Sequence, residues 1–130
     1  MAIEFKVILE DAPGSLAHFG AVLGDADVNI DGIHGTSGEG KSVVHFVTGQ
    51  AGLAVAALDA AGLDYITRDV VLVNVLDEPG TLGDVALVMA EAGINIDSVY
   101  ATIRGDVVLG VDDVEGAIQV AGGMAVMARS

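Results

Sequence analysis

The chain repeats one stretch of its own sequence. A segment that begins Asp-Ala-Pro-Gly-Ser-Leu at Asp11 returns 66 residues later as Asp-Glu-Pro-Gly-Thr-Leu at Asp77. Without any gap, nine of the 25 positions from 11 to 35 are identical to their counterparts from 77 to 101. The two prolines of the chain, Pro13 and Pro79, occupy the same position of the repeat. This self-similarity predicts that one arrangement of helices and strands is used twice.

The repeat divides the 130 residues into two halves, which we place at 1–68 and 69–130. Each half is close to the size at which a lone hydrophobic core is marginally stable, so we expect the halves to pack on each other or on a second chain. Hydrophobic residues make up 52% of the chain but aromatic residues only 4%. The predicted cores are therefore aliphatic, and no linker separates the halves.

Both halves show the same predicted order of elements. Residues 3–9 and 69–75 alternate apolar and polar side chains, which indicates a strand with one buried face. A Pro-Gly turn and an amphipathic helix follow, and the hydroxyl groups of Ser15 and Thr81 are placed to cap these helices. A hairpin, a weaker helix and a short last strand complete each half.

The predicted hairpins turn at Glu39-Gly40 and at Arg104-Gly105. The weaker helices end at glycines, which are Gly62 in the first half and Gly122-Gly123 in the second. The remaining strands are predicted at 28–36, 42–48, 63–68, 94–103, 106–111 and 124–128. The order βαββαβ predicts an α+β fold of two ferredoxin-like units, each an antiparallel four-stranded sheet with both helices on one face.

These features resemble the ACT domain family. The resemblance rests on Asp-x-Pro-Gly-x-Leu between the first strand and helix, and on a hydrophobic-Asn-Ile sequence at the start of the second strand, at Asn29 and again at Asn95. It covers essentially the whole chain as two copies, which implies a free-standing tandem ACT protein. The resemblance implies a regulatory, non-catalytic module that binds a small ligand, most often an amino acid, where two ACT units meet.

The resemblance also implies which residues contact the ligand, namely the Asp of each turn and the Asn of each Asn-Ile pair. The chemistry is suitable, because free amides at a helix start bind a carboxylate and a nearby Asp can hold an ammonium group. The alternative is that the Asp residues only stabilise their turns and that each Asn fixes a strand start. The predicted site residues are Asp11, Gly14, Ser15, Leu16, Asn29, Asp77, Gly80, Thr81, Leu82 and Asn95, and we expect the second site to be occupied in preference to the first.

A competing motif lies in the first half, where Gly35 to Ser42 fits the phosphate-loop pattern G-x-x-x-x-G-K-[ST]. A phosphate loop needs a helix after its Lys-Ser pair, whereas a strand-like run follows Ser42. We therefore predict a hairpin, in which His34 faces His45. We interpret this histidine pair as packing rather than a metal site, and the second half places Tyr100 and Leu109 at the equivalent positions.

Charge and composition limit the partners. Nineteen acidic and five basic side chains give a formal charge of −14, which repels nucleic acid and anionic membranes. Glu4 and Lys6 interrupt the N-terminus, and no apolar run approaches the ~20 residues of a membrane span, so we expect a cytoplasmic protein. We expect no cofactor, metal or catalytic residue, a homodimer or larger oligomer, and a regulated enzyme as a possible partner. The rival hypothesis is a structural oligomerisation module without ligand.

Overall fold

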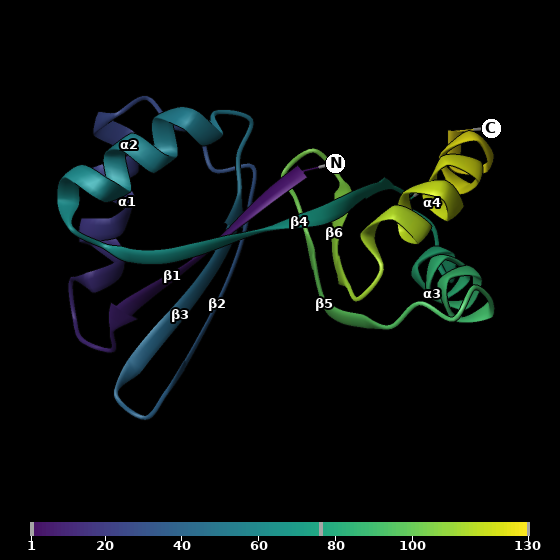
Figure 1. The fold of residues 1–130 in the computed structure, drawn as a ribbon, viewed down its shortest axis with the longest axis horizontal. Helices are drawn as coiled ribbons and strands as arrows, with labels where there is room; N and C mark the ends of the chain where they lie inside the picture. Colours follow the sequence, from purple (N-terminus) through teal and green to yellow (C-terminus); the bar gives the residue numbers. More distant parts are fainter. Residues whose placement is uncertain (1, 76, 130) are drawn as a thin grey trace. The chain divides into compact units, whose positions relative to one another are not determined.

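A computed structural model describes residues 2–75 and 77–129 (Figure 1). The chain forms two compact units, one of Ile3–Arg68 and one that extends from Asp69 onward. In chain order the elements are β1 (Ala2–Glu10), α1 (Ser15–Asp25), β2 (Gly32–Gly38), β3 (Lys41–Val47), α2 (Ala51–Ala61), β4 (Asp64–Asn74), α3 (Thr81–Glu91), β5 (Ile96–Ala101), β6 (Asp106–Val111) and α4 (Val114–Arg129). The fold is α+β and ferredoxin-like, with antiparallel strand pairs and helices packed on them.

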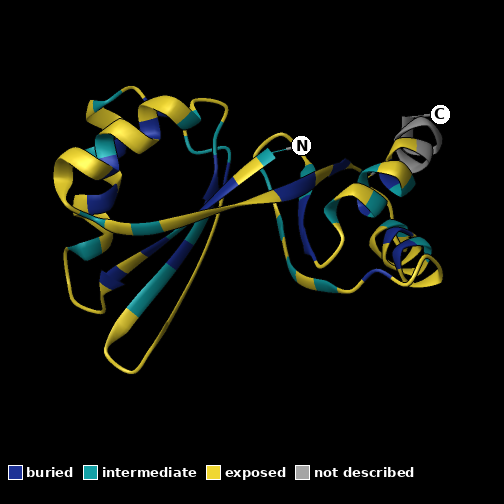
Figure 2. Ribbon diagram, viewed as in Figure 1, coloured by how far each residue is buried: buried dark blue, intermediate teal, exposed yellow. Residues whose placement is uncertain are grey.

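The first unit has the strand order β2-β3-β1-β4. Its core consists of one face of the sheet and the buried sides of α1 and α2 (Figure 2). Three phenylalanines lie at its centre, because Phe46 stacks on Phe5 with ring centroids 4.9 Å apart and meets Phe19 edge-on at 5.5 Å. Both helices therefore pack on the same face of the sheet, as the sequence predicts.

The second unit has the strand order β4-β6-β5. Its core contains Val71 and Val73 of β4, Val85 and Met89 of α3, and small residues of α4 such as Ala117. Aliphatic and methionine side chains fill this core, which agrees with the expectation for the second half. The first core does not agree, because aromatic rings form its centre.

The prediction of two four-stranded units is wrong in two places, so that the described residues form six strands rather than eight. The strands predicted at 63–68 and 69–75 are one strand, β4, because no proline, glycine or turn sequence interrupts the chain between them. The strand predicted at 124–128 lies within α4, which continues through Gly122-Gly123 instead of ending there. Alanine and methionine dominate this segment, and both are strong helix formers.

The first hairpin confirms its predicted tip. Glu39 and Gly40 both have positive φ, 55° and 78°, which is the signature of a type I′ turn. Lys41 begins β3 and its ammonium group contacts the carboxylate of Glu10. Since a strand follows, the phosphate-loop alternative does not hold, and His34 pairs with His45 across the hairpin with ring centroids 6.2 Å apart.

The second hairpin differs from its prediction by one residue. Tyr100 pairs with Val108 rather than with Leu109. The amide of Thr102 donates to the carbonyl oxygen of Asp106 at 2.8 Å, so that the loop is longer than the predicted two-residue tip. An irregularity between Ile96 and Ser98 shifts the register of β5 once more.

One carboxylate of the first unit is buried on the side of β1 that faces away from the helices. The side chain of Glu4 is 1% exposed, and its Oε1 lies 3.2 Å from both Nδ1 of His45 and Nε of Arg68. These contacts join three strands, since the partners come from β3 and β4. Among the residues that the structure describes, no helix is both long and apolar enough to cross a membrane.

Candidate functional site

The two Pro-Gly turns have nearly the same backbone geometry. Gly14 has φ 89° and ψ −12°, and Gly80 has φ 91° and ψ −11°. This left-handed conformation strongly favours glycine. Each glycine is the N-cap residue of its helix, and neither helix has a side-chain cap, so the capping roles predicted for Ser15 and Thr81 are wrong. Ser15 and Thr81 are the first residues of their helices, one position after the N-cap.

Hydrogen bonds within the first turn use part of the predicted anion site. The amide of Ser15 donates to the carbonyl oxygen of Ala12 at 3.2 Å, and that of His18 donates to Gly14 at 2.9 Å. In the described part of the first unit, the amide of Leu16 donates no hydrogen bond, because it lies in the helix turn whose amides lack intrahelical partners. Asp11 is exposed beside it, and its amide donates to the carbonyl oxygen of Gly40 at 3.1 Å, which joins the turn to the hairpin tip.

The structure separates the Pro-Gly turn of the first unit from the Asn of the same unit. Glu10 pairs with Lys41 at one end of β3, and Gly32 pairs with Val47 at the other end. These ends are about 20 Å apart at about 3.3 Å per residue. The turn follows Glu10, whereas Asn29 precedes Gly32, so one unit does not bring the two predicted contacts together.

The side chain of Asn29 joins the start of β2 to the loop after β3. Its Nδ2 donates to Oδ1 of Asp31 at 3.0 Å, and Asp31 accepts the amide of Gly49 at 3.0 Å. The main chain of Asn29 takes part as well, because its amide donates to Oε1 of Gln50 at 2.8 Å and its carbonyl oxygen accepts the hydroxyl of Thr48 at 2.6 Å. These hydrogen bonds support the alternative interpretation, in which Asn29 fixes the start of the second strand.

The second unit arranges its predicted residues in the same order. The hydroxyl of Thr81 donates to the carbonyl oxygen of Glu78 at 3.0 Å, and the following helix carries Asp84 in its first turn. The amide of Asn95 donates to Oδ1 of Asp112 at 3.0 Å. Asp77, Gly80, Leu82 and Asn95 are all exposed.

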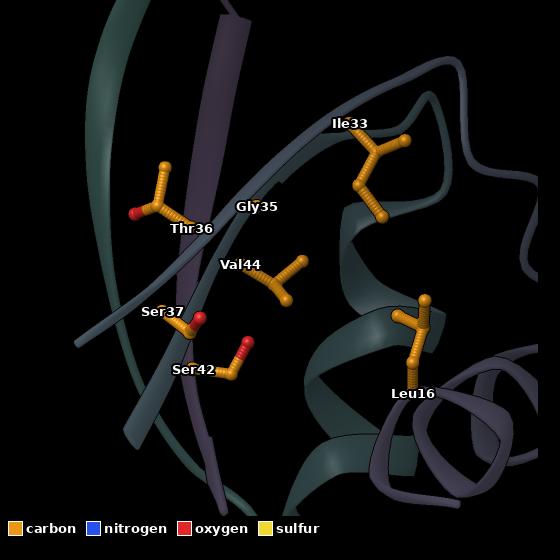
Figure 3. Close-up of a pocket in the computed structure, with 7 residues that line it drawn as sticks. All are labelled: Leu16, Ile33, Gly35, Thr36, Ser37, Ser42 and Val44. Carbon is orange, nitrogen blue, oxygen red and sulfur yellow. The ribbon is translucent and has the colours of Figure 1, made fainter. Parts of the chain in front are cut away.

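A pocket of about 360 Å³ lies beside the first Pro-Gly turn, between the start of α1 and the β2–β3 hairpin (Figure 3). Leu16 is the one predicted site residue in its lining. The hairpin supplies the others, which the sequence analysis missed: Ile33, Gly35, Thr36, Ser37, Ser42 and Val44. The pocket belongs to the first unit, whereas the sequence favoured the second site.

Small residues on the helix-facing side of the hairpin create this pocket. Gly35 pairs with Val44, and Ser37 pairs with Ser42. The β2 residue of each pair has a small side chain or none, which leaves space on this side of the hairpin. Side chains on a strand alternate between faces, and Ile33 lies on the same face as these residues. The side chain of Thr36 points to the opposite side (Figure 3). The run of glycine and serine in this edge strand could have predicted the pocket. It does so only if these residues lie on the side of the strand that faces the helices.

Comparison with known proteins agrees with this fold. Residues 3–60 match the ACT domain family, so the first unit contains an ACT domain. The match supports one such domain and not the two that the repeat predicts. No curated protein sequence matches the chain.

Solved structures share the architecture at low sequence identity. Protein BT0572 from Bacteroides thetaiotaomicron is 20% identical, with a TM-score of 0.87 over 95% of this chain and 88% of its own. The ligand-free regulatory subunit of aspartate kinase from Thermus thermophilus is 20% identical, with a TM-score of 0.72 over 98% and 92%. The corresponding subunit from Thermus flavus is 19% identical, with a TM-score of 0.63 over 93% and 90%. At these identities the likeness establishes the fold alone.

Proposed function

We propose that this protein is a non-catalytic regulator that binds an amino acid at the Pro-Gly turn of its ACT domain. The observation that carries the proposal is the position of Leu16, which lies in the first turn of α1 and also lines the pocket. A carboxylate placed at the helix start would gain amide donors and the helix dipole. Asp11, exposed in the same turn, is placed to attract an ammonium group.

We also propose that residues 69–130 form a second ACT domain, in addition to the first at 1–68. The 66-residue repeat supports this, as does the agreement of Gly80 with Gly14 in φ and ψ to within a few degrees. The second unit retains the helix, the hairpin and the Asn of the first unit. The second unit differs from the first in that its described residues form a sheet of three strands instead of four.

A ligand that contacts both a turn and an Asn would lie where two units meet. The separation of the turn from Asn29 within one unit supports this arrangement, because a single unit does not place both around one molecule. The second unit separates its residues in the same way. The turn with Asp77, Gly80 and Leu82 follows the end of β4 that pairs with Asp106, whereas Asn95 precedes Ile96, which pairs with Val111 at the other end of β6. The fold is shared with regulatory subunits of aspartate kinase, which supports an enzyme as the regulated partner.

A thermal-shift screen of the proteinogenic amino acids tests the proposal. A ligand present at about 100 times its Kd stabilises the folded state by about 2.7 kcal/mol, which raises the melting temperature by several degrees. We expect such a rise for one chemical group of amino acids. A melting temperature unchanged by every amino acid at millimolar concentration would contradict the proposal.

Two variants locate the contact within this test. Asn95→Ala is expected to weaken binding of the amino acid found in the screen by about 1–3 kcal/mol, through the loss of one hydrogen bond in a desolvated site. Asn29→Ala is expected to weaken it less, because the Asn29 side chain is bonded to Asp31. Calorimetric titration of both folded variants gives the comparison, and unchanged affinity in both would show that the asparagines are structural.

Exposed aliphatic side chains favour a second candidate, an oligomerisation module. Leu16 and Ile33 are 60% and 44% exposed, and Leu82 and Val99, 66 residues further on, are 52% and 47% exposed. Ile33 and Val99 lie on β2 and β5, which end the strand order and leave unpaired backbone groups, while Leu16 and Leu82 lie in the first turns of α1 and α3. The same exposed aliphatic positions therefore recur in both units.

We expect light scattering to give the mass of a dimer or a larger oligomer at micromolar concentration, since buried apolar area would drive the association. Ile33→Lys and Val99→Lys together should shift the mass toward the monomer, whereas Ile66→Lys, at an exposed position of β4, serves as the control. A monomer at high micromolar concentration would exclude the oligomerisation module and leave the amino-acid regulator untouched.

A further inference from the structure

We infer that the pocket between α1 and the β2–β3 hairpin selects amino acids with a branched aliphatic side chain, such as leucine, isoleucine and valine. The inference rests on the proposed function and specifies its ligand. A volume of about 360 Å³ lies at the small end of the range of metabolite pockets, about 300–1,000 Å³. The pocket therefore suits a ligand with few atoms.

The apolar part of the lining comes from three separate elements. Leu16 lies on α1, Ile33 on β2 and Val44 on β3, and Figure 3 shows these side chains around the same space. Val44 is buried and belongs to the core cluster, which makes it a fixed floor. An aliphatic side chain placed among them would exchange water for apolar contact, and the exposed parts of Leu16 and Ile33 would become covered.

The polar part of the lining is uncharged. Ser37 and Ser42 contribute hydroxyl groups, and no charged residue lines this pocket in the part of the chain that the structure describes. Lys41 and Glu10 lie near the hairpin tip, but they contact each other, and strand alternation places them on the opposite face of the sheet. A lysine or aspartate side chain would lose its hydration here without gaining an opposite charge.

The absence of a side chain at Gly35 keeps the space open. A Cβ at this position would lie 3.7 Å from Cγ2 of Val44, which is ordinary contact, and Gly35 does not have a positive φ. The second unit does not repeat this pair of small strand residues, because Ala101 stands 66 residues beyond Gly35, and Ile103, 66 residues beyond Ser37, lies in the loop between β5 and β6. The proposed selectivity therefore belongs to the first unit.

The test compares ligands on the wild-type protein and then fills the pocket. L-leucine, L-valine, L-lysine and L-aspartate are titrated by calorimetry into the wild-type chain, into Gly35→Val and into Gly38→Val. The control Gly38→Val adds the same side chain to the same strand, where a Cβ meets no atom within 4 Å. We expect leucine or valine to bind the wild type at least about tenfold more tightly than lysine and aspartate.

Filling the pocket should abolish this preference. Gly35→Val is expected to weaken leucine binding by about tenfold or more, the discrimination that hydrophobic pockets reach for one or two methyl groups, with Gly38→Val near the wild type. Circular dichroism checks that each variant is folded, and Gly35→Ala replaces Gly35→Val if the larger residue prevents folding.

Other results overturn the inference in distinguishable ways. If lysine or aspartate binds as tightly as leucine, the proposed amino-acid regulator stands and the aliphatic selectivity is wrong. If leucine binds but Gly35→Val leaves its affinity unchanged, the ligand occupies another place. If none of the amino acids binds to the wild type, the proposed function fails together with the inference.

Discussion

Phe46→Ala is expected to lower the free energy of unfolding of the first unit by about 3–5 kcal/mol, the usual effect of truncating a buried aromatic ring. Phe46 is fully buried and contacts both Phe5 and Phe19, so its removal leaves a cavity at the meeting point of β1, β3 and α1. A typical domain is stable by about 5–15 kcal/mol, so this loss is a large fraction of the total.

Urea unfolding followed by circular dichroism measures the effect. Ile66→Ala is the matched control, because Ile66 lies in the same unit but is 63% exposed, and surface substitutions usually change stability by less than about 0.5 kcal/mol. Equal losses for the two variants would contradict the central role given to the aromatic cluster.

Arg68→Met is expected to reduce the free energy of unfolding by about 1–3 kcal/mol, because it removes a positive charge from beside a buried carboxylate. Nε of Arg68 lies 3.2 Å from Oε1 of Glu4, whose side chain is almost completely buried. Methionine retains much of the apolar stem of arginine, so packing changes less than charge does.

The control for this prediction is Arg68→Lys, which keeps the positive charge and should retain part of the stabilisation. Chemical denaturation of the three proteins at neutral pH gives the comparison. If Arg68→Met were as stable as the wild type and Arg68→Lys less stable than either, the contact with Glu4 would have no stabilising role.

The elements that could be predicted from the sequence are those specified by local chemistry. The Pro-Gly pairs mark where a strand ends and a helix begins, and alternating apolar residues identify the buried face of β1. Glu39-Gly40 specifies a two-residue turn. The length of this turn sets the register of the hairpin and therefore the pairing of His34 with His45. These features need no information from distant parts of the chain.

The features that were missed depend on longer-range or competing effects. The one-residue error at Tyr100 arose because the second hairpin has a longer loop, whose length Arg104-Gly105 does not specify. The strand predicted at 124–128 is wrong because the intrinsic helix preference of this segment, rich in alanine and methionine, favours continuation of α4.

The candidate site was only partly predictable for a related reason. The sequence identified Leu16 and the helix start, but it did not show that the turn and Asn29 lie at opposite ends of the sheet. That result needs the strand directions. The pocket needs the register as well, since Gly35 and Ser37 form a hollow only because they face α1 and not the other side.

The small residues of β2 have a further consequence, which concerns selection. Glycine and serine are poor strand formers, and a β-branched residue at Gly35 would fit the strand without backbone strain. Improving the strand and keeping the hollow are therefore opposing demands on one position. A laboratory evolution experiment that selected for thermal stability alone would therefore favour valine or isoleucine at Gly35, and the more stable variant would have lost the hollow beside α1.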